Sequence, residues 1–177
     1  MWYAVQVPYG REEQIMDLCK KLISPDLLQD CFIPHYQRKR KYHGIWHIEE
    51  RSLFPGYLFV ISDEVESLFF SLKKLPYLTK LLGDQEQAIS LYPEEVMFLT
   101  QMAGRERCIQ MSYGYIEGDQ VIITEGAMVN FHGKIKYIDR HKREAVIEVV
   151  FFGGQPTDIK VGLEIIKKIN KKEDVQL

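Results

Sequence analysis

The side chains with the most evident chemistry form a basic segment in the first third of the chain. Four consecutive cations there are flanked by histidine and tyrosine on both sides, and they are Arg38, Lys39, Arg40 and Lys41. Lysine and arginine bind phosphate groups, and neighbouring aromatic rings offer surfaces on which bases stack. The pattern indicates a nucleic-acid-binding segment. The alternative is a solvated hairpin whose charges only keep it soluble.

A second basic cluster occurs near residue 140. It combines a short basic run with lysines that alternate along the preceding segment, and its members are Lys134, Lys136, Arg140, Lys142 and Arg143. Residues 113–177 contain as many acidic as basic side chains. Ordinary turn charges are therefore the alternative.

Patterns of catalysis and metal binding are weak. His43 and His47 have the spacing of a helical metal pair, but Gly44 and the polar surroundings indicate a hairpin instead. The acidic pairs Glu49–Glu50 and Glu94–Glu95 are adjacent, and neighbours in sequence point apart on helices and strands. Neither a GxxxxGK[ST] loop nor a GxSxG elbow occurs. We therefore expect a binding protein, not an enzyme, without metal or cofactor.

The composition is that of an ordinary globular protein. The 177 residues are 46% hydrophobic and carry a formal net charge of −2. Because the molecule as a whole is not basic, a phosphate-binding surface must be local. No apolar run approaches the roughly 20 residues of a membrane-spanning helix, and the first residues lack a secretory pattern. We expect a cytoplasmic monomer with no membrane partner.

Hydrophobic periodicity predicts alternating helices and strands in the first part of the chain. Apolar residues at i, i+3, i+4 and i+7 predict helices over 11–23 and 65–72, and Pro93 begins a third that ends at Gly104. The continuous apolar run Tyr57–Ile61 predicts a central strand buried on both faces. The remaining expected elements are strands at 2–7, 31–34 and 78–82 and a protruding hairpin over 37–50.

The pattern changes beyond a first domain that we bound at residues 1–106. After a linker over 107–115, apolar residues recur at every second position and glycines fall at turn-like intervals. Short strands joined in this way are typical of a small β-barrel, which we assign to residues 116–170. Residues 171–177 are expected to be a frayed tail. The predicted fold class is α+β: an α/β sandwich with a mostly antiparallel sheet, followed by a small barrel.

Three parts of the sequence together resemble the NusG family of transcription factors. They are Trp2–Gln6 (WYAVQ), Phe54–Val60 (FPGYLFV), and the stretch that runs from Gly118–Val121 (GDQV) to Phe131–Ile135 (FHGKI). Their order and spacing match the family, and the resemblance extends over almost the whole chain. The resemblance implies an N-terminal NGN domain and a C-terminal KOW barrel, which coincide with the two domains expected above.

The resemblance also implies a partner. In the NusG family the NGN domain docks an apolar concavity on the tips of the clamp helices of the RNA polymerase β′ subunit. The corresponding residues here are Phe54, Pro55, Tyr57 and Phe59. Rigid aromatic anchors suit such an interface, and alternate residues of a strand share a face, so Tyr57 and Phe59 point the same way. The alternative is that these two rings only fill the core.

The family includes housekeeping elongation factors and specialised paralogues such as LoaP and RfaH, which recognise a nucleic-acid signal and suppress pausing or termination. Residues 118–127 are more similar to the specialised paralogues. The resemblance thus implies an antitermination factor recruited by a leader RNA hairpin or by a DNA strand. It also implies that Arg11, at the start of the first expected helix, is a further nucleic-acid-binding candidate, because that edge lies near the DNA in relatives; the alternative is a routine surface arginine. The KOW barrel would be free to touch RNA or a ribosomal protein. The alternatives are a housekeeping NusG and a ribosome-associated KOW protein that binds RNA.

Overall fold

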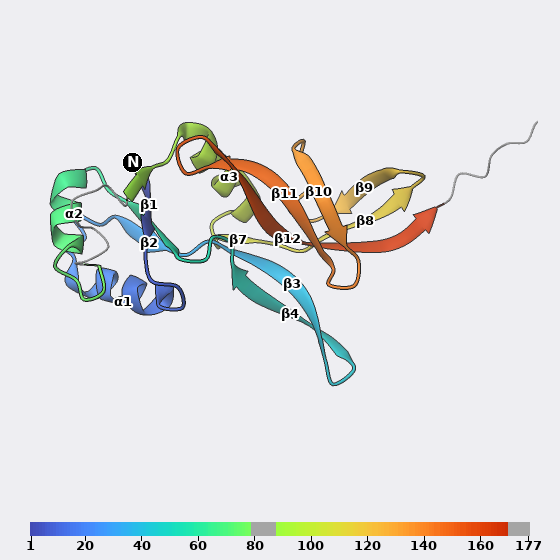
Figure 1. Cartoon of the computed structure of the whole chain (residues 1–177), viewed down its shortest axis with the longest axis horizontal. Coiled ribbons are helices and arrows are strands. Elements are labelled where there is room, and N and C mark those ends of the chain that lie inside the picture. The colour runs from blue at the N-terminus through green and yellow to red at the C-terminus, as the bar shows by residue number, and fades with distance from the viewer. Residues whose placement is uncertain (79–87, 170–177) are drawn as a thin grey trace, which may run out of the picture.

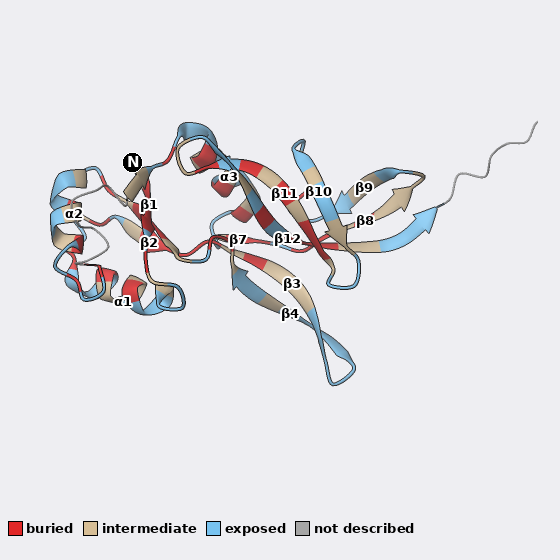
Figure 2. Ribbon diagram, viewed as in Figure 1, coloured by how far each residue is buried: buried red, intermediate tan, exposed pale blue. Residues whose placement is uncertain are grey.

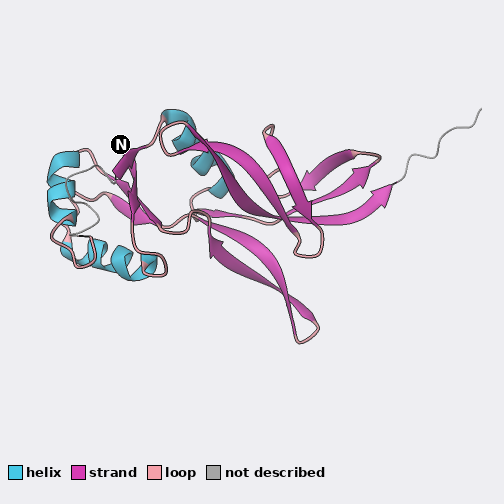
Figure 3. Cartoon of the chain, viewed as in Figure 1, coloured by secondary structure: helices cyan, strands magenta, loops and turns pink. Residues whose placement is uncertain are grey.

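Two of the helices lie at one end of the molecule, the third lies nearer its middle, and strands extend from there to the other end (Figure 1, Figure 3). The computed structural model describes residues 1–78 and 88–169, and within these ranges the chain forms three helices and three sheets. The predicted α+β class is confirmed. None of the helices in the described ranges is long and apolar enough to cross a membrane.

The first sheet is antiparallel throughout. Its strands, in the order β2-β5-β1-β6, are β1 (Trp2–Gln6), β2 (Asp30–Phe32), β5 (Tyr57–Ile61) and β6 (Ala88–Ser90). The predicted central strand is confirmed, because β5 lies between β2 and β1 and its middle residues are buried. The strand expected at 78–82 lies, apart from Leu78, outside the described residues.

The three predicted helices are confirmed, and they cover opposite faces of this sheet. They are α1 (Glu12–Leu22), α2 (Val65–Leu72) and α3 (Pro93–Ala103). The buried residues of α1 and α2 share one core with Leu58 and Val60 of β5. Leu99 of α3 belongs instead to the core that contains Phe59. The period-two alternation of β5 therefore divides its side chains between two cores.

The predicted hairpin is formed by β3 (His35–Tyr42) and β4 (Ile45–Ser52). Both residues of its two-residue turn, His43 and Gly44, have positive φ, which is the backbone of turns that match the twist of paired strands. The short strand β7 (Cys108–Ile109) pairs in parallel with the base of β3. Towards its tip the hairpin projects from the molecule and both strands are exposed (Figure 2).

The C-terminal part is a five-stranded sheet in the order β10-β11-β12-β8-β9. Its strands are β8 (Ser112–Glu117), β9 (Gln120–Glu125), β10 (Lys134–Asp139), β11 (Glu144–Phe151) and β12 (Gln155–Ile169). The first half of β12 pairs with β11, and its second half runs parallel to β8. In the part of the chain that the structure describes, no ladder joins β9 to β10, so the strands expected in a barrel form one sheet with two edges.

The stretch expected as a linker, residues 107–115, is held by hydrogen bonds and is not a free connector. It contains β7 and the first residues of β8. The carbonyl oxygen of Arg107 also accepts a hydrogen bond from the amide of His35 at 2.8 Å. The edge of β3 presents unpaired backbone groups, and pairing with this stretch satisfies them.

A close approach between backbones joins the hairpin to the C-terminal sheet. A Cβ atom at Gly162 of β12 would lie 2.2 Å from the carbonyl oxygen of Gln37 and 2.2 Å from the sulfur of Met111. Only a residue without a side chain lets β12 lie directly on β3. The C-terminal sheet consequently shares a buried core with the first sheet, in which Ile147 and Phe151 pack with Phe59.

We expect Gly162→Ala to lower the free energy of unfolding of the full chain by about 1–3 kcal/mol, the usual cost of overpacking a close contact. Lys160→Ala, an exposed position on the same strand, is the matched control and should change stability by about 0.5 kcal/mol or less. Urea unfolding followed by tryptophan fluorescence measures both. Equal unfolding midpoints for the two variants would contradict the close packing at Gly162.

Candidate functional site

The residues assigned to polymerase docking converge on one end of β5. The ring centroids of Phe54 and Phe59 are 5.5 Å apart. Tyr57 packs against the same core as these two rings, as expected from its alternation with Phe59 along the strand. Pro55 lies beside them and is exposed. Phe54, Tyr57 and Phe59 are called the aromatic face below.

The aromatic face is covered by the turn between β11 and β12. The Phe151 ring lies 4.7 Å from that of Phe54, and the Phe152 ring stacks on Tyr57 with 4.4 Å between centroids. Phe54 and Phe59 are buried beneath this turn, whereas Tyr57 is half-buried. In this arrangement the surface expected to meet a partner is therefore part of the protein core.

A buried carboxylate on α3 holds the covering turn in place. Glu95 is 1% exposed. Its Oε1 atom accepts hydrogen bonds from the amides of Gly153 at 3.2 Å and Gly154 at 3.3 Å, and its Oε2 atom accepts one from the amide of Tyr92 at 2.7 Å. One side chain thus caps its own helix and fixes the β11–β12 turn.

Sequence reasoning placed Glu95 in the first turn of a helix, which is confirmed, but did not connect it with the glycine pair. The glycine pair Gly153–Gly154 was the feature of the sequence that could have indicated an anion-binding turn. Both glycines have positive φ, and successive residues of this kind direct neighbouring amides towards one point, where they bind an anion. Which carboxylate would supply the negative charge is decided only by the packing of α3.

Two of the predicted nucleic-acid-binding cations pair with carboxylates across the contact between the hairpin and the C-terminal sheet. Arg38 of β3 lies 3.6 Å from Glu144 of β11. Lys39 forms an ion pair with Glu164 of β12, and Arg143, which lies on the same side of the contact as Glu164, pairs with that carboxylate at 2.9 Å. Arg38 and Lys39 therefore fasten the two parts of the molecule together in the closed arrangement.

The environment of Glu144 also changes the ionisation of its neighbours. The Tyr36 hydroxyl donates a hydrogen bond to Glu144 at 3.1 Å. Burial raises the pKa of Tyr36, and the Glu144 carboxylate raises it further, because a phenolate would be desolvated and would lie next to a second negative charge. Burial disfavours the charge on Arg38, but the hydrogen bond to Glu49 and the attraction of the Glu49 and Glu144 carboxylates together outweigh this effect and raise the pKa of Arg38.

The hairpin and the β10–β11 turn bring the two basic segments of the sequence together. They form a groove of about 410 Å³, which we call the basic groove. Its lining residues are Arg38, Lys39, Arg40, Lys41, Trp46, His141 and Lys142. Sequence reasoning treated the two segments as separate clusters, because nothing in their spacing indicates that they meet.

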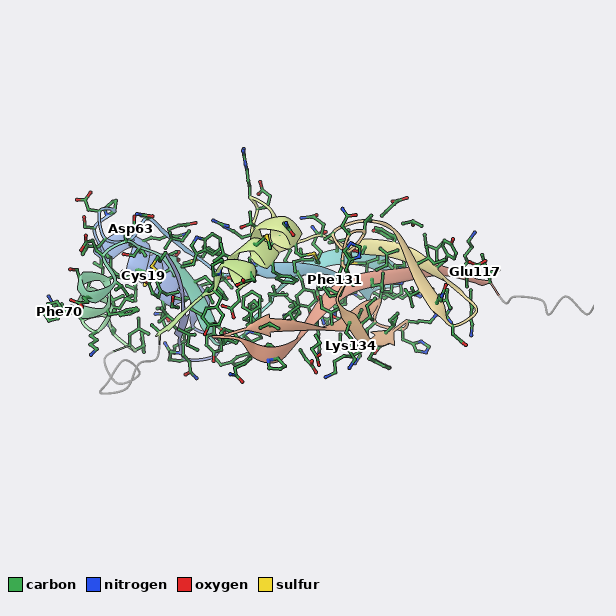
Figure 4. The ribbon with its side chains drawn as sticks, turned by 90° about the horizontal axis from the view of Figure 1, so that it is seen from above. Cys19, Asp63, Phe70, Glu117, Phe131 and Lys134 are labelled. Atoms are coloured by element: carbon green, nitrogen blue, oxygen red, sulfur yellow. The ribbon has the colours of Figure 1, made fainter. Side chains whose placement is uncertain are left out.

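The other predicted cations lie outside the lining of the groove. Lys136 is paired with Asp158 at 2.8 Å. Arg140 is exposed in the β10–β11 turn. Lys134 is exposed on the C-terminal sheet, between the two ends of the molecule that Phe70 and Glu117 mark in Figure 4. The remaining candidate, Arg11, lies 4.5 Å above the ring of Tyr77.

Trp46 is the large aromatic residue of the groove, and the sequence analysis did not assign it to binding. It is 37% exposed, and the guanidinium of Arg143 lies 3.6 Å from the centre of its ring. It pairs with Lys41 across the hairpin. A tryptophan opposite a lysine in a polar hairpin was the signal available in the sequence, because such a large ring normally needs either a core or a ligand.

A family model described as NusG, transcription termination factor nusG, matches residues 1–100. The chain belongs to the NusG family. Two relatives named "Transcription termination/antitermination protein NusG" match over most of their lengths. That of Helicobacter pylori is 23% identical over 177 residues, covering 95% of this chain and 98% of its own. That of Thermus thermophilus is 27% identical over 165 residues, covering 86% of this chain and 90% of its own.

A solved structure described as "Domain interaction in Thermotoga maritima NusG" is similar in fold. It has a TM-score of 0.53 and 24% sequence identity, and the match covers 93% of each chain. The shared fold therefore extends over both the N-terminal and the C-terminal parts of this NusG-family protein. The family is one of transcription termination and antitermination factors, as the resemblance in the sequence predicted.

We expect Glu95→Ala to release the β11–β12 turn of this NusG-family protein. The substitution removes two hydrogen bonds between a carboxylate and the amides of Gly153 and Gly154, each of a kind that contributes about 1.5–3 kcal/mol. Amide hydrogen exchange across residues 151–155 should accelerate by about tenfold or more. Glu94→Ala, at the exposed neighbouring position, is the control. Unchanged exchange in the Glu95 variant would show that the carboxylate does not hold the turn.

Proposed function

We propose that this NusG-family protein is a transcription elongation and antitermination factor that acts by binding and not by catalysis. Its partner is RNA polymerase, which the aromatic face and Pro55 bind at the tips of the β′ clamp helices. The observation that carries this proposal is the clustering of three rings on the face of β5 opposite to α1 and α2. Clustered rings supply a large apolar contact with little loss of side-chain entropy.

Binding at this face requires the β11–β12 turn to move away. Phe151 and Phe152 occupy the place that a coiled-coil tip would take, and Glu95 fixes their turn. The protein would alternate between the closed arrangement described above and an open one in which the aromatic face is free. A partner that binds only the open arrangement shifts this equilibrium, and its apparent affinity is reduced in proportion to the open fraction.

Recruitment by a nucleic-acid signal, a leader RNA hairpin or an exposed DNA strand, is the second part of the proposal. The exposed cations around the hairpin and the β10–β11 turn support it, since such a surface attracts phosphate although the whole chain is acidic. The factor would act in the cytoplasm as a monomer. Once released, the C-terminal sheet could contact a ribosomal protein.

A housekeeping NusG that acts at most genes is the second candidate. The near full-length match to NusG proteins of other bacteria favours it. The two candidates differ in recruitment, because a specialised factor requires one sequence or hairpin and a housekeeping factor does not. Transcription assays on templates with and without a candidate leader element separate them.

Two substitutions that remove the same ring contact test the docking proposal. We expect Tyr57→Ala to weaken binding of a purified β′ clamp-helix fragment by about tenfold or more, because an anchor of the interface is lost. We expect Phe152→Ala to strengthen binding by up to about tenfold, because the closed arrangement loses its stacking on Tyr57. Isothermal titration calorimetry with the full chain measures both.

Both variants lose the stacking between Tyr57 and Phe152, so the docking proposal is tested by whether their effects on binding are opposite in direction. Effects of equal sign would mean that Tyr57 acts only through the contact between the two parts of the chain. No binding by the wild type would argue against the polymerase proposal, and ribosome co-sedimentation would then point to a ribosome-associated protein. Circular dichroism of each variant confirms that it is folded.

A further inference from the structure

We infer that the basic groove binds a single strand of nucleic acid, with phosphates along Arg40, Lys41 and Lys142 and a base stacked on Trp46. The inference deepens the proposed recruitment by nucleic acid and rests on it. It assigns to one composite site the cations that the sequence places in two distant segments. The site has one wall on the hairpin and the other on the β10–β11 turn.

The cations at the rim of the groove are available to a ligand. Lys41 has no ion pair within residues 1–78 and 88–169. Arg40 is exposed and lies 4.0 Å from Glu49, at the limit of an ion pair. Lys142 is 71% exposed and lies 3.7 Å from Asp139. Phosphate groups can therefore bind these side chains without breaking a buried interaction.

The deeper cations have a different role. Arg38 and Lys39 are held by carboxylates of the hairpin and of the C-terminal sheet. They therefore form an ordered floor of the groove, which lowers the entropy lost when a ligand binds. The contact of Arg143 with the ring of Trp46 joins the two walls directly. Both walls are positioned before a ligand arrives.

The aromatic side chain distinguishes a single strand from a duplex. Trp46 is the ring in the lining of the groove, and part of its surface remains exposed beside Arg143. Bases can stack on such a ring only where they are not already stacked within a double helix. A volume of about 410 Å³ is that of a small-ligand pocket, which suits a base with its sugar and not a helix.

Titration of the full chain into short fluorescein-labelled RNA, DNA and duplex DNA of one sequence, followed by fluorescence anisotropy, tests the inference. We expect both single strands to bind more tightly than the duplex. The affinities for the RNA and for the single-stranded DNA show which of the two nucleic acids the groove prefers. Trp46→Ala should weaken single-strand binding by about fivefold to a hundredfold, and Trp46→Phe should restore much of it. Lys41→Glu and Lys142→Glu should each weaken it by about tenfold and reduce its salt dependence.

Lys168→Glu is the matched control, since it reverses the same charge at an exposed position of β12 that lies outside the groove and is not among the predicted binding residues. We expect it to change the affinity by less than about twofold. An equal loss in this variant, tighter binding of the duplex, or a loss from Lys41→Glu without one from Lys142→Glu would each overturn the composite single-strand site. Binding of the β′ fragment is measured in a separate titration without nucleic acid, so failure of the groove proposal can be distinguished from failure of the docking proposal.

Discussion

Strand β5 is buried on both faces, and each face belongs to a different core. Leu58 and Val60 pack with α1 and α2, whereas Phe59 packs with α3 and with strands of the C-terminal sheet. An apolar surface of this kind is stable only when it is covered. The position of the C-terminal sheet therefore follows from the need to cover the second face, and the turn at Phe151 and Phe152 supplies the cover.

The contact that covers the aromatic face also assembles the basic groove. Close packing at Gly162 and the ion pairs of Glu144 and Glu164 bring the C-terminal sheet against the hairpin. Movement of that sheet to expose the aromatic face would separate the two walls of the groove. The proposed polymerase and single-strand sites would then be coupled, because each would favour a different arrangement of the same two parts.

Local features of the fold could be predicted because their causes lie within a few residues. The helices at α1, α2 and α3 follow from apolar spacing and from Pro93 at a helix start, and the hairpin follows from Gly44 within a polar stretch. The family was also predicted from motifs in the sequence, and the family model and the relatives confirm that family. The sequence of residues 107–115 resembles a linker because the pairing of β7 with the edge of β3 depends on a strand far away in the sequence.

The sequence by itself determined the three helices, the central strand, the hairpin, the alternation of side chains on β5 and the family. Tertiary structure alone decided that the aromatic face is covered, that Glu95 binds the amides of Gly153 and Gly154, and that two basic segments form one groove with Trp46. The physical reason is the range of the interactions. Propensity and periodicity act between neighbours, whereas burial and ion pairing depend on which distant surfaces come within contact distance.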